Sequence, residues 1–237
     1  MIENHRVLGI IGGMGPMATA DLFTKIVDIT DAETDNDHIH ILIDNNSFIP
    51  DRTEAILRGD DAPLREIVKS AKRLEAQGAD MLIMPCNTGH FYYDEISAQC
   101  KVPLINMVRE TALNIKGRGY NKAALLSTDG ALKSGVFPKY FEGSGIELFY
   151  PDEDTQRLIM HIIYDEVKAG KKPDISVLFP WLENMKRQGV QIFILGCTEL
   201  PIAFEGCRDF SFADTTEILA ESAVISMGYK LKRTHTT

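Results

Sequence analysis

The chain has 237 residues, of which 44% are hydrophobic and 25% are charged, so it can bury a core and form one large domain or two small ones. No stretch approaches the roughly 20 consecutive apolar residues that a membrane helix needs. The 34 acidic residues outnumber the 25 basic ones, and no dense Lys/Arg patch exists, which argues against nucleic-acid binding. Because the N-terminus also lacks a secretory-signal pattern, we expect a cytoplasmic protein without a membrane or nucleic-acid partner.

Short runs of strand-forming residues alternate along the chain with longer segments of helical periodicity. The eight expected strands are residues 7–11, 39–43, 81–84, 104–106, 123–126, 146–149, 192–195 and 210–213. Strands that alternate with helices indicate parallel βαβ units, and strands as apolar as residues 81–84 suit a sheet covered on both faces. The sequence therefore predicts an α/β fold built on parallel sheets.

An internal repeat divides this pattern into two similar halves. Residues 77–88 match residues 188–199, since each segment has the end of a helix, a glycine, an apolar strand and then a cysteine. The glycine loop at residues 12–15 has a looser counterpart at residues 127–130. A repeat of this kind indicates two related α/β units in one chain.

The boundary between the two units is expected at residues 116–121, where glycines interrupt a helical pattern. We predict a first domain of residues 1–116, completed by a C-terminal helix at residues 215–237, and a second domain of residues 117–214. Because no long linker separates them, the two pseudo-symmetric domains are expected to pack together, with the active site in the cleft between them.

Two of the four cysteines end the repeated strands. Cys86 and Cys197 stand where open parallel sheets bind ligands, beyond the C-terminal ends of the strands. Two facing halves would bring these thiols to opposite sides of a small molecule. Inverting a stereocentre by proton transfer needs a base on one face of the carbon and an acid on the other, so this pattern is what a racemase requires.

The competing interpretation is that a cysteine is only a small buried hydrophobe. It applies best to Cys100 and Cys207, which follow no strong strand and have no counterpart in the other half. No CxxC pair and no disulfide framework are present. For the repeated pair, the neighbouring Asn87, Thr88 and Thr198 are polar residues suited to stabilising a thiolate.

Four segments resemble aspartate racemases and the related broad-specificity amino-acid racemases: residues 12–16 (GGMGP), 49–53 (IPDRT), 85–88 (PCNT) and 196–200 (GCTEL). The resemblance spans nearly the whole chain. It implies two pseudo-symmetric α/β domains, catalysis without pyridoxal phosphate, any other cofactor or a metal, and a homodimer. Glutamate racemases usually have Cys-Thr-His where this chain has Cys-Thr-Glu, which favours the aspartate or broad-specificity branch.

The resemblance also assigns roles. Cys86 and Cys197 would be the catalytic pair, and Arg52 would clamp a substrate carboxylate with its fork of N–H donors. Lys168 would contact a side-chain carboxylate, which indicates an acidic substrate. Met14 would place a backbone amide near the substrate, from a loop whose glycines permit close approach. With Thr128 lining the pocket from the second half, the predicted substrate-binding residues are Met14, Arg52, Asn87, Thr88, Thr128, Lys168 and Thr198.

Other functions were weighed against this one. Residues 13–18 fit the GxGxxA fingerprint of dinucleotide loops, but no acidic residue ends a second strand about 20 positions later. Cys86, His90 and Cys197 are suitable zinc ligands in a spacing that matches no recognised zinc motif. A cysteine-dependent isomerase such as maleate isomerase and a non-catalytic amino-acid-binding protein are the open alternatives. We predict a cofactor-independent amino-acid racemase for aspartate, glutamate or a broader set of amino acids.

Overall fold

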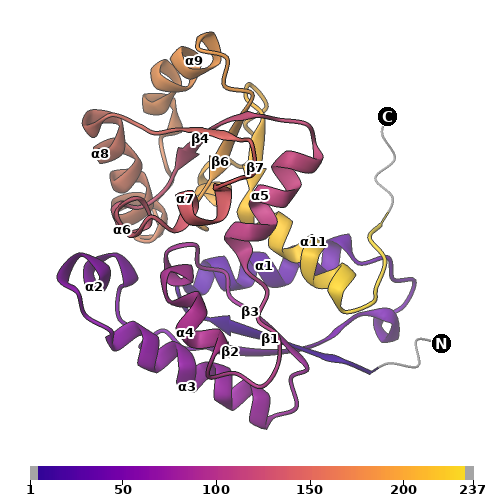
Figure 1. The fold of residues 1–237 in the computed structure, drawn as a ribbon. Helices are drawn as coiled ribbons and strands as arrows, with labels where there is room; N and C mark the ends of the chain where they lie inside the picture. The colour runs from indigo at the N-terminus through magenta and orange to yellow at the C-terminus, as the bar shows by residue number, and fades with distance from the viewer. Residues whose placement is uncertain (1–4, 233–237) are drawn as a thin grey trace.

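The computed structural model describes residues 5–232, which form two parallel sheets, one in the lower half and one in the upper half of Figure 1. The first sheet has the strand order β2-β1-β3 and the second the order β5-β4-β6-β7. All pairings within both sheets are parallel. The predicted α/β fold with two parallel sheets is therefore confirmed.

The first half of the chain supplies the first sheet and the helices around it. Its elements are β1 (Val7–Gly12), α1 (Pro16–Ile29), η1 (Asp35–Asp37), β2 (His40–Asn45), α2 (Arg52–Arg58), α3 (Ala62–Ala76), β3 (Met81–Ile83), η2 (Thr88–Tyr92), α4 (Tyr93–Ser97) and α5 (Met107–Gly117).

The second half repeats this alternation with shorter helices. Its elements are β4 (Lys122–Leu126), α6 (Asp129–Ser134), α7 (Val136–Phe141), β5 (Glu147–Phe149), α8 (Glu153–His161), the π-helix η3 (Ile162–Val167), η4 (Ile175–Leu178), α9 (Phe179–Arg187), β6 (Ile192–Leu195), α10 (Leu200–Ala203), β7 (Phe212–Asp214) and α11 (Thr215–Ser226).

The two sheets share one strand order, except at their fourth position. In the second sheet β7 pairs with β6, whereas in the first sheet Leu104 only forms an isolated bridge with Leu82. The prediction of a strand at residues 104–106 is therefore wrong, because the structure has only this bridge there. It cannot extend, because the side chain of Asn106 already accepts a hydrogen bond from the backbone N–H of Arg109 and caps α5.

Each sheet is covered on both faces, which explains why β3 and β6 are apolar throughout. In the first sheet, Leu82 packs toward α3, while Ile83 packs toward α1 and α11. In the second sheet, Phe193 packs toward α8 and α9, and Ile192 packs toward α5 and α7. The strand ends are therefore held rigidly where the functional residues begin.

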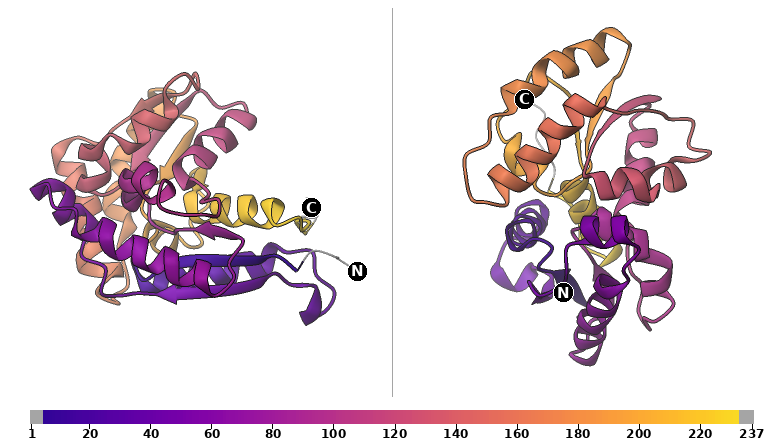
Figure 2. Two further views of the ribbon diagram at one scale, coloured as in Figure 1. Left: turned by 60° about the horizontal axis from the view of Figure 1, so that its bottom comes forward. Right: turned by 90° about the vertical axis from the view of Figure 1, so that its left-hand side faces the viewer.

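Two helices cross between the halves. α11, at the C-terminal end of the second half, packs its Ala220 and Val224 with Leu22 of α1, and it lies over the strands of the first sheet (Figure 2, left). α5, at the end of the first half, packs its Ala112 with Leu125 of the second sheet.

The boundary at residues 116 and 117 remains a prediction. The predicted C-terminal helix ends earlier than expected, at Ser226, and residues 233–237 lie outside the described residues. No helix in residues 5–232 is long and apolar enough to span a bilayer.

Candidate active site

A small cavity lies between the two halves, at the C-terminal ends of the central strands. Its volume is about 10 Å³, the room for about one water molecule. All nine residues that the sequence predicted for the site line it. The full lining is Met14, Asp51, Arg52, Thr53, Cys86, Asn87, Thr88, Thr128, Tyr164, Lys168, Cys197, Thr198 and Glu199.

Cys86 is presented by the loop that follows β3, and it is 5% exposed. Its Sγ accepts a hydrogen bond from the backbone N–H of Gly89 at 3.3 Å. Negative charge on Cys86 also raises the pKa of Arg52 against the lowering effect of burial, so the guanidinium and this sulfur interact. An N–H donor and a cation are both features that favour a thiolate.

Cys197 follows β6 in the equivalent place, but its surroundings differ. Its Sγ donates to the Glu199 carboxylate at 2.9 Å. Burial raises the pKa of the Cys197 thiol well above its ordinary value, Glu199 raises it further, and Lys168 opposes both. Both cysteines are free thiols, so the two sulfurs at this cavity are available for proton transfer.

Arg52 is the first residue of α2 and is 7% exposed, and backbone carbonyls hold its guanidinium. Nη1 donates to the carbonyl of Pro50 at 3.0 Å, and Nη2 donates to that of Met14 at 3.0 Å. Met14, predicted to offer an amide to the substrate, thus contributes a carbonyl that orients the arginine. Within the described part of the chain, the buried Nε of Arg52 has no hydrogen-bond partner.

Asn87 connects the two halves behind the cavity. Its Nδ2 donates to Thr215 Oγ1 at 2.9 Å, and that hydroxyl donates to the carbonyl of Leu195 at 2.9 Å. This chain of bonds fixes which end of the Asn87 amide is the donor. Among residues 5–232, its buried Oδ1 is an acceptor without a partner. Two residues that line the cavity therefore each carry a buried polar atom without a partner in residues 5–232, a donor on Arg52 and an acceptor on Asn87.

Threonine hydroxyls also meet across the cavity. Thr88 Oγ1 of the first half and Thr128 Oγ1 of the second lie 2.9 Å apart, and Thr128 Oγ1 accepts from the N–H of Ala131 as the cap of α6. A Cβ on Gly130 would lie 2.6 Å from the Cα of Thr53, so the two halves approach each other closely here. Thr198 instead donates to Glu199 at 3.3 Å.

The outer wall of the cavity is a cluster of three polar side chains. Tyr164 Oη donates to Asp51 Oδ2 at 3.0 Å, and Lys168 Nζ lies 3.9 Å from the same oxygen. The Lys168 ammonium also lies 4.1 Å from the centroid of the Tyr164 ring. Tyr164 lies in the π-helix η3, and Lys168 is the residue that caps its C-terminal end. A π-helix is a deformation of the α-helix that is frequent at functional sites.

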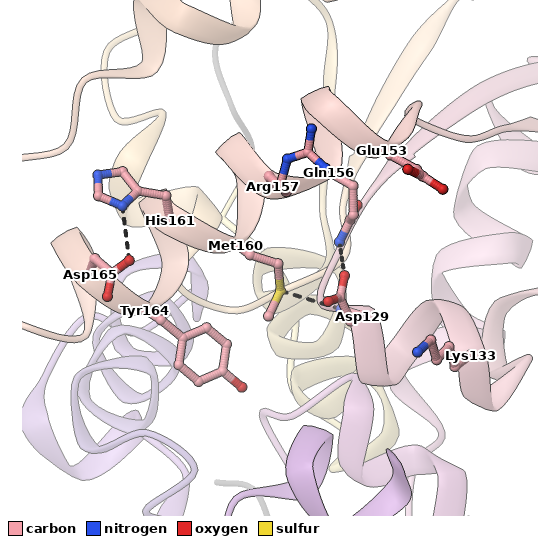
Figure 3. Close-up of a pocket in the computed structure, with 9 residues that line it drawn as sticks. All are labelled: Asp129, Lys133, Glu153, Gln156, Arg157, Met160, His161, Tyr164 and Asp165. Atoms are coloured by element: carbon pink, nitrogen blue, oxygen red, sulfur yellow. Dashed lines mark hydrogen bonds and ion pairs between the residues drawn. The ribbon is translucent and has the colours of Figure 1, made fainter.

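Beyond this wall lies an open groove of about 660 Å³ between α6 and α8. Figure 3 shows Tyr164 at one end of it and the Gln156–Asp129 hydrogen bond, 2.8 Å long, in its middle. Tyr164 lines both the groove and the smaller cavity that contains the two cysteines. Tyr164 is therefore the side chain that the cavity and the groove share.

Four residues of the lining were not predicted as site residues: Asp51, Thr53, Tyr164 and Glu199. Asp51 and Thr53 flank Arg52 in the motif at residues 49–53, and Glu199 lies in the motif at residues 196–200, so treating every polar residue of those motifs as a candidate would have found them. Tyr164 lies four residues before Lys168, the spacing that places two side chains on one helix face.

The glycine loop after β1 serves packing rather than phosphate binding. Gly13 has a φ of +90°, and a Cβ there would lie 2.3 Å from the backbone carbon of Asn46. Its N–H donates to Thr19 Oγ1 at 2.9 Å. An amide already paired inside the protein is not free for a pyrophosphate, which weighs against the dinucleotide alternative.

His90 connects the Cys86 loop to the start of α5. Nδ1 donates to the carbonyl of Cys86 at 2.8 Å, and Nε2 accepts the backbone N–H of Met107 at 3.0 Å. Both ring nitrogens are thus engaged, which weighs against His90 as a zinc ligand. The bonds require the neutral imidazole, and burial lowers the pKa of His90 from 6.5 to about 4.

A pH dependence of stability follows from this depressed pKa. The unfolded chain takes up the His90 proton below about pH 6.5 and the folded chain only below about pH 4. This contribution is fully present above pH 6.5 and is lost as the pH falls toward 4, by about 3 kcal/mol. The free energy of unfolding is measured with urea between pH 7.5 and pH 4, and each protein is compared with its own value at neutral pH. This free energy should fall less toward pH 4 in His90→Gln than in the wild type. His161→Gln, a change at an exposed histidine, should retain the wild-type slope.

Comparisons with known proteins agree with the fold and the motifs. The family described as Asp/Glu/hydantoin racemase matches residues 11–223. The broad-specificity amino-acid racemase RacX of Bacillus subtilis is 28% identical over 225 residues, covering 92% of this chain and 96% of RacX. The Picrophilus torridus aspartate racemase structure is 34% identical, covers 96% of both chains and superposes with a TM-score of 0.84.

A more distant structure shares the fold alone. Glutamate racemase from Francisella tularensis, solved in complex with D-glutamate, is 18% identical and covers 94% of this chain and 82% of its own, with a TM-score of 0.67. The family assignment therefore depends on the family match, with the aspartate racemase structure and RacX as the relatives of higher identity. On these findings, the chain belongs to the Asp/Glu/hydantoin racemase family.

Proposed function

We propose that this protein is a cofactor-independent racemase of amino acids, in which Cys86 and Cys197 exchange the Cα proton. The observation that carries the proposal is the pair of free thiols at the same buried cavity, one from each half of the repeat. Aspartate, glutamate or a broader set of amino acids would be the substrate. The names of the aspartate racemase and of RacX support this range of substrates.

In the proposed reaction one cysteine starts as a thiolate and the other as a thiol. The thiolate removes the Cα proton, and the electron pair left on the carbon spreads into the carboxylate, whose charge Arg52 stabilises. The opposite thiol then gives its proton to the other face of the carbon and keeps the electron pair as a thiolate. The substrate gains and loses one proton, and its configuration is inverted.

The unpaired polar atoms favour an amino acid over a diacid without an amine. Arg52 Nε is a donor suited to a carboxylate, and Asn87 Oδ1 is an acceptor suited to an ammonium group. A buried polar atom without a partner costs about 1–3 kcal/mol, so a ligand that supplies both partners is preferred. Maleate supplies only the acceptor, which argues against the maleate isomerase alternative.

Lys168 and Arg52 support an acidic substrate, but Lys168 is not free. Its Nζ lies beside Asp51 and over the Tyr164 ring. A substrate side-chain carboxylate would have to compete with Asp51 for this cation. We therefore infer that Lys168 acts at the wall of the cavity, after Asp51 has moved away from it.

Proton NMR in D₂O tests the proposed function. Purified protein without added cofactor is incubated with L- and D-amino acids, including aspartate and glutamate, and with maleate. Loss of the Cα proton signal together with formation of the opposite enantiomer is expected for at least one acidic amino acid. Conversion of maleate alone would support the isomerase instead, and binding without Cα exchange would support a binding protein.

A homodimer is the second part of the proposal, implied by the resemblance. Phe48, which is 90% exposed, and Met17, which is 66% exposed, are the large apolar side chains with the highest exposure among the described residues. Analytical ultracentrifugation at several concentrations gives the mass in solution. A species of twice 26.4 kDa is expected, and a monomer at every concentration would refute it.

A further inference from the structure

We propose that Glu199 is a positioning residue that keeps Cys197 in the thiol form in the resting protein, which leaves Cys86 as the resting base. The inference rests on the proposed function, because it gives the two cysteines different starting roles. Glu199 is not among the nine site residues that the sequence predicts, and it lines the cavity together with Cys197.

The hydrogen bonds at the two sulfurs run in opposite directions. Cys197 Sγ donates to Glu199 Oε2 at 2.9 Å, which requires the sulfur to hold a proton. Cys86 Sγ accepts the N–H of Gly89 at 3.3 Å, which a thiolate does best. Glu199 is 4% exposed, so its carboxylate faces the thiol in a setting where water does little to screen charge.

The charged groups near the two sulfurs support the same difference between Cys197 and Cys86. Cys197 faces Glu199 of its own loop, and from η3 it faces the Lys168 ammonium and the Tyr164 hydroxyl. Lys168 is divided between this sulfur and Asp51, so it offsets Glu199 only in part. Cys86 faces Arg52, a full cation held by the backbone. The full cation thus lies beside Cys86, whereas a carboxylate disfavours negative charge on Cys197.

One turnover that begins in this state ends in the opposite one. Cys86 now holds the proton taken from Cα and is a thiol. Cys197 has given its proton to the carbon and is a thiolate beside the Glu199 carboxylate. Two negative charges at 2.9 Å repel strongly in a buried site. Uptake of one proton from water by Cys197, with release of one from Cys86, restores the resting state, and Glu199 supplies the driving force for this reset.

Titration of a single thiol tests the inference without any substrate. In a chain with Cys86→Ser, Cys100→Ser and Cys207→Ser, Cys197 is the remaining thiol, and its ionisation is followed by the ultraviolet absorbance of the thiolate. Adding Glu199→Gln should let Cys197 ionise at a pH lower by about one unit or more, because a like charge is removed. Glu205→Gln, at an exposed glutamate of the same segment, should leave the titration unchanged.

The complementary chain retains Cys86 alone, with Cys197, Cys100 and Cys207 each changed to serine. Glu199→Gln should leave the ionisation of Cys86 in this chain nearly unchanged, whereas a general disturbance of the fold would move both sulfurs. Unchanged ionisation of Cys197 after Glu199→Gln would overturn the proposal. If the glutamine variant does not fold, Glu199→Asp, which withdraws the carboxylate by one methylene, should give a smaller shift in the same direction, and no shift would refute the proposal.

The full protein supplies a kinetic check. For the direction in which Cys197 is the acid, the rate should fall at high pH as Cys197 loses its proton, and Glu199→Gln should move this fall to lower pH. If no amino acid is racemised at all, the proposed function fails while the titration result still decides the role of Glu199.

Discussion

Replacing Cys86 or Cys197 with serine should lower the rate of racemisation by about 10⁴-fold, the upper end of what a positioned acid or base contributes. The hydroxyl of serine is a far weaker acid than a thiol, so it can neither remove the Cα proton nor return it effectively. Because the two sulfurs act on opposite faces, each single change should be nearly as damaging as the double change. The rate of appearance of the opposite enantiomer, measured by chiral chromatography, checks this.

The matched controls are the two cysteines outside the cavity. Burial raises the pKa of Cys100 to about 11, so its thiol is protonated at neutral pH and unsuited to act as a base. Cys100→Ser and Cys207→Ser should therefore leave the rate nearly unchanged. A well-folded Cys86→Ser or Cys197→Ser protein with near-normal turnover would refute the two-cysteine mechanism, and severe loss in a control would show that a different pair is catalytic.

Replacing Arg52 with lysine should lower kcat/KM by about 10²- to 10³-fold, even though the positive charge is retained. Each hydrogen bond to a charged group is worth about 1.5–3 kcal/mol, and lysine lacks the planar fork that serves Met14, Pro50 and a substrate carboxylate together. Steady-state kinetics give the change in kcat/KM. Urea unfolding gives the separate cost to stability of leaving the two backbone carbonyls unpaired.

Arg58→Lys is the control for this change, because Arg58 is in the same helix. Its side chain is 73% exposed and pairs with Glu54 on the surface, so both kinetics and stability should be close to those of the wild type. If Arg52→Lys retained full activity, a bidentate clamp at this position would be ruled out.

Local patterns determined much of the site. The strand followed by a cysteine was visible twice, because a buried strand, a preceding glycine and a helix end are each encoded within about a dozen residues. The seven substrate-binding candidates came from short motifs and from the family resemblance, and all of them line the cavity. Sequence separation did not matter, since the parallel sheets bring their strand ends to common edges.

The tertiary structure decided how those residues are used. Asn87 meets Thr215 across 128 positions, Tyr164 meets Asp51 across 113, and the Met14 carbonyl accepts from Arg52 across 38. No local pattern encodes such partners. The contrast between Cys86 and Cys197, which the repeat presents as equivalents, likewise comes from the groups packed around each sulfur.

The sequence by itself determined the α/β fold, the repeat and the two thiols, because strand and helix periodicity and the motifs are local properties of the chain. Only the tertiary structure decided the reduction of residues 104–106 to a bridge, the crossing of α5 and α11 between the halves, and the contact of Glu199 with Cys197. The helix crossings depend on which distant apolar faces meet when the halves pack. The other two are short-range contacts, Asn106 with Arg109 and Glu199 with Cys197, and the burial that comes with packing decides their effect.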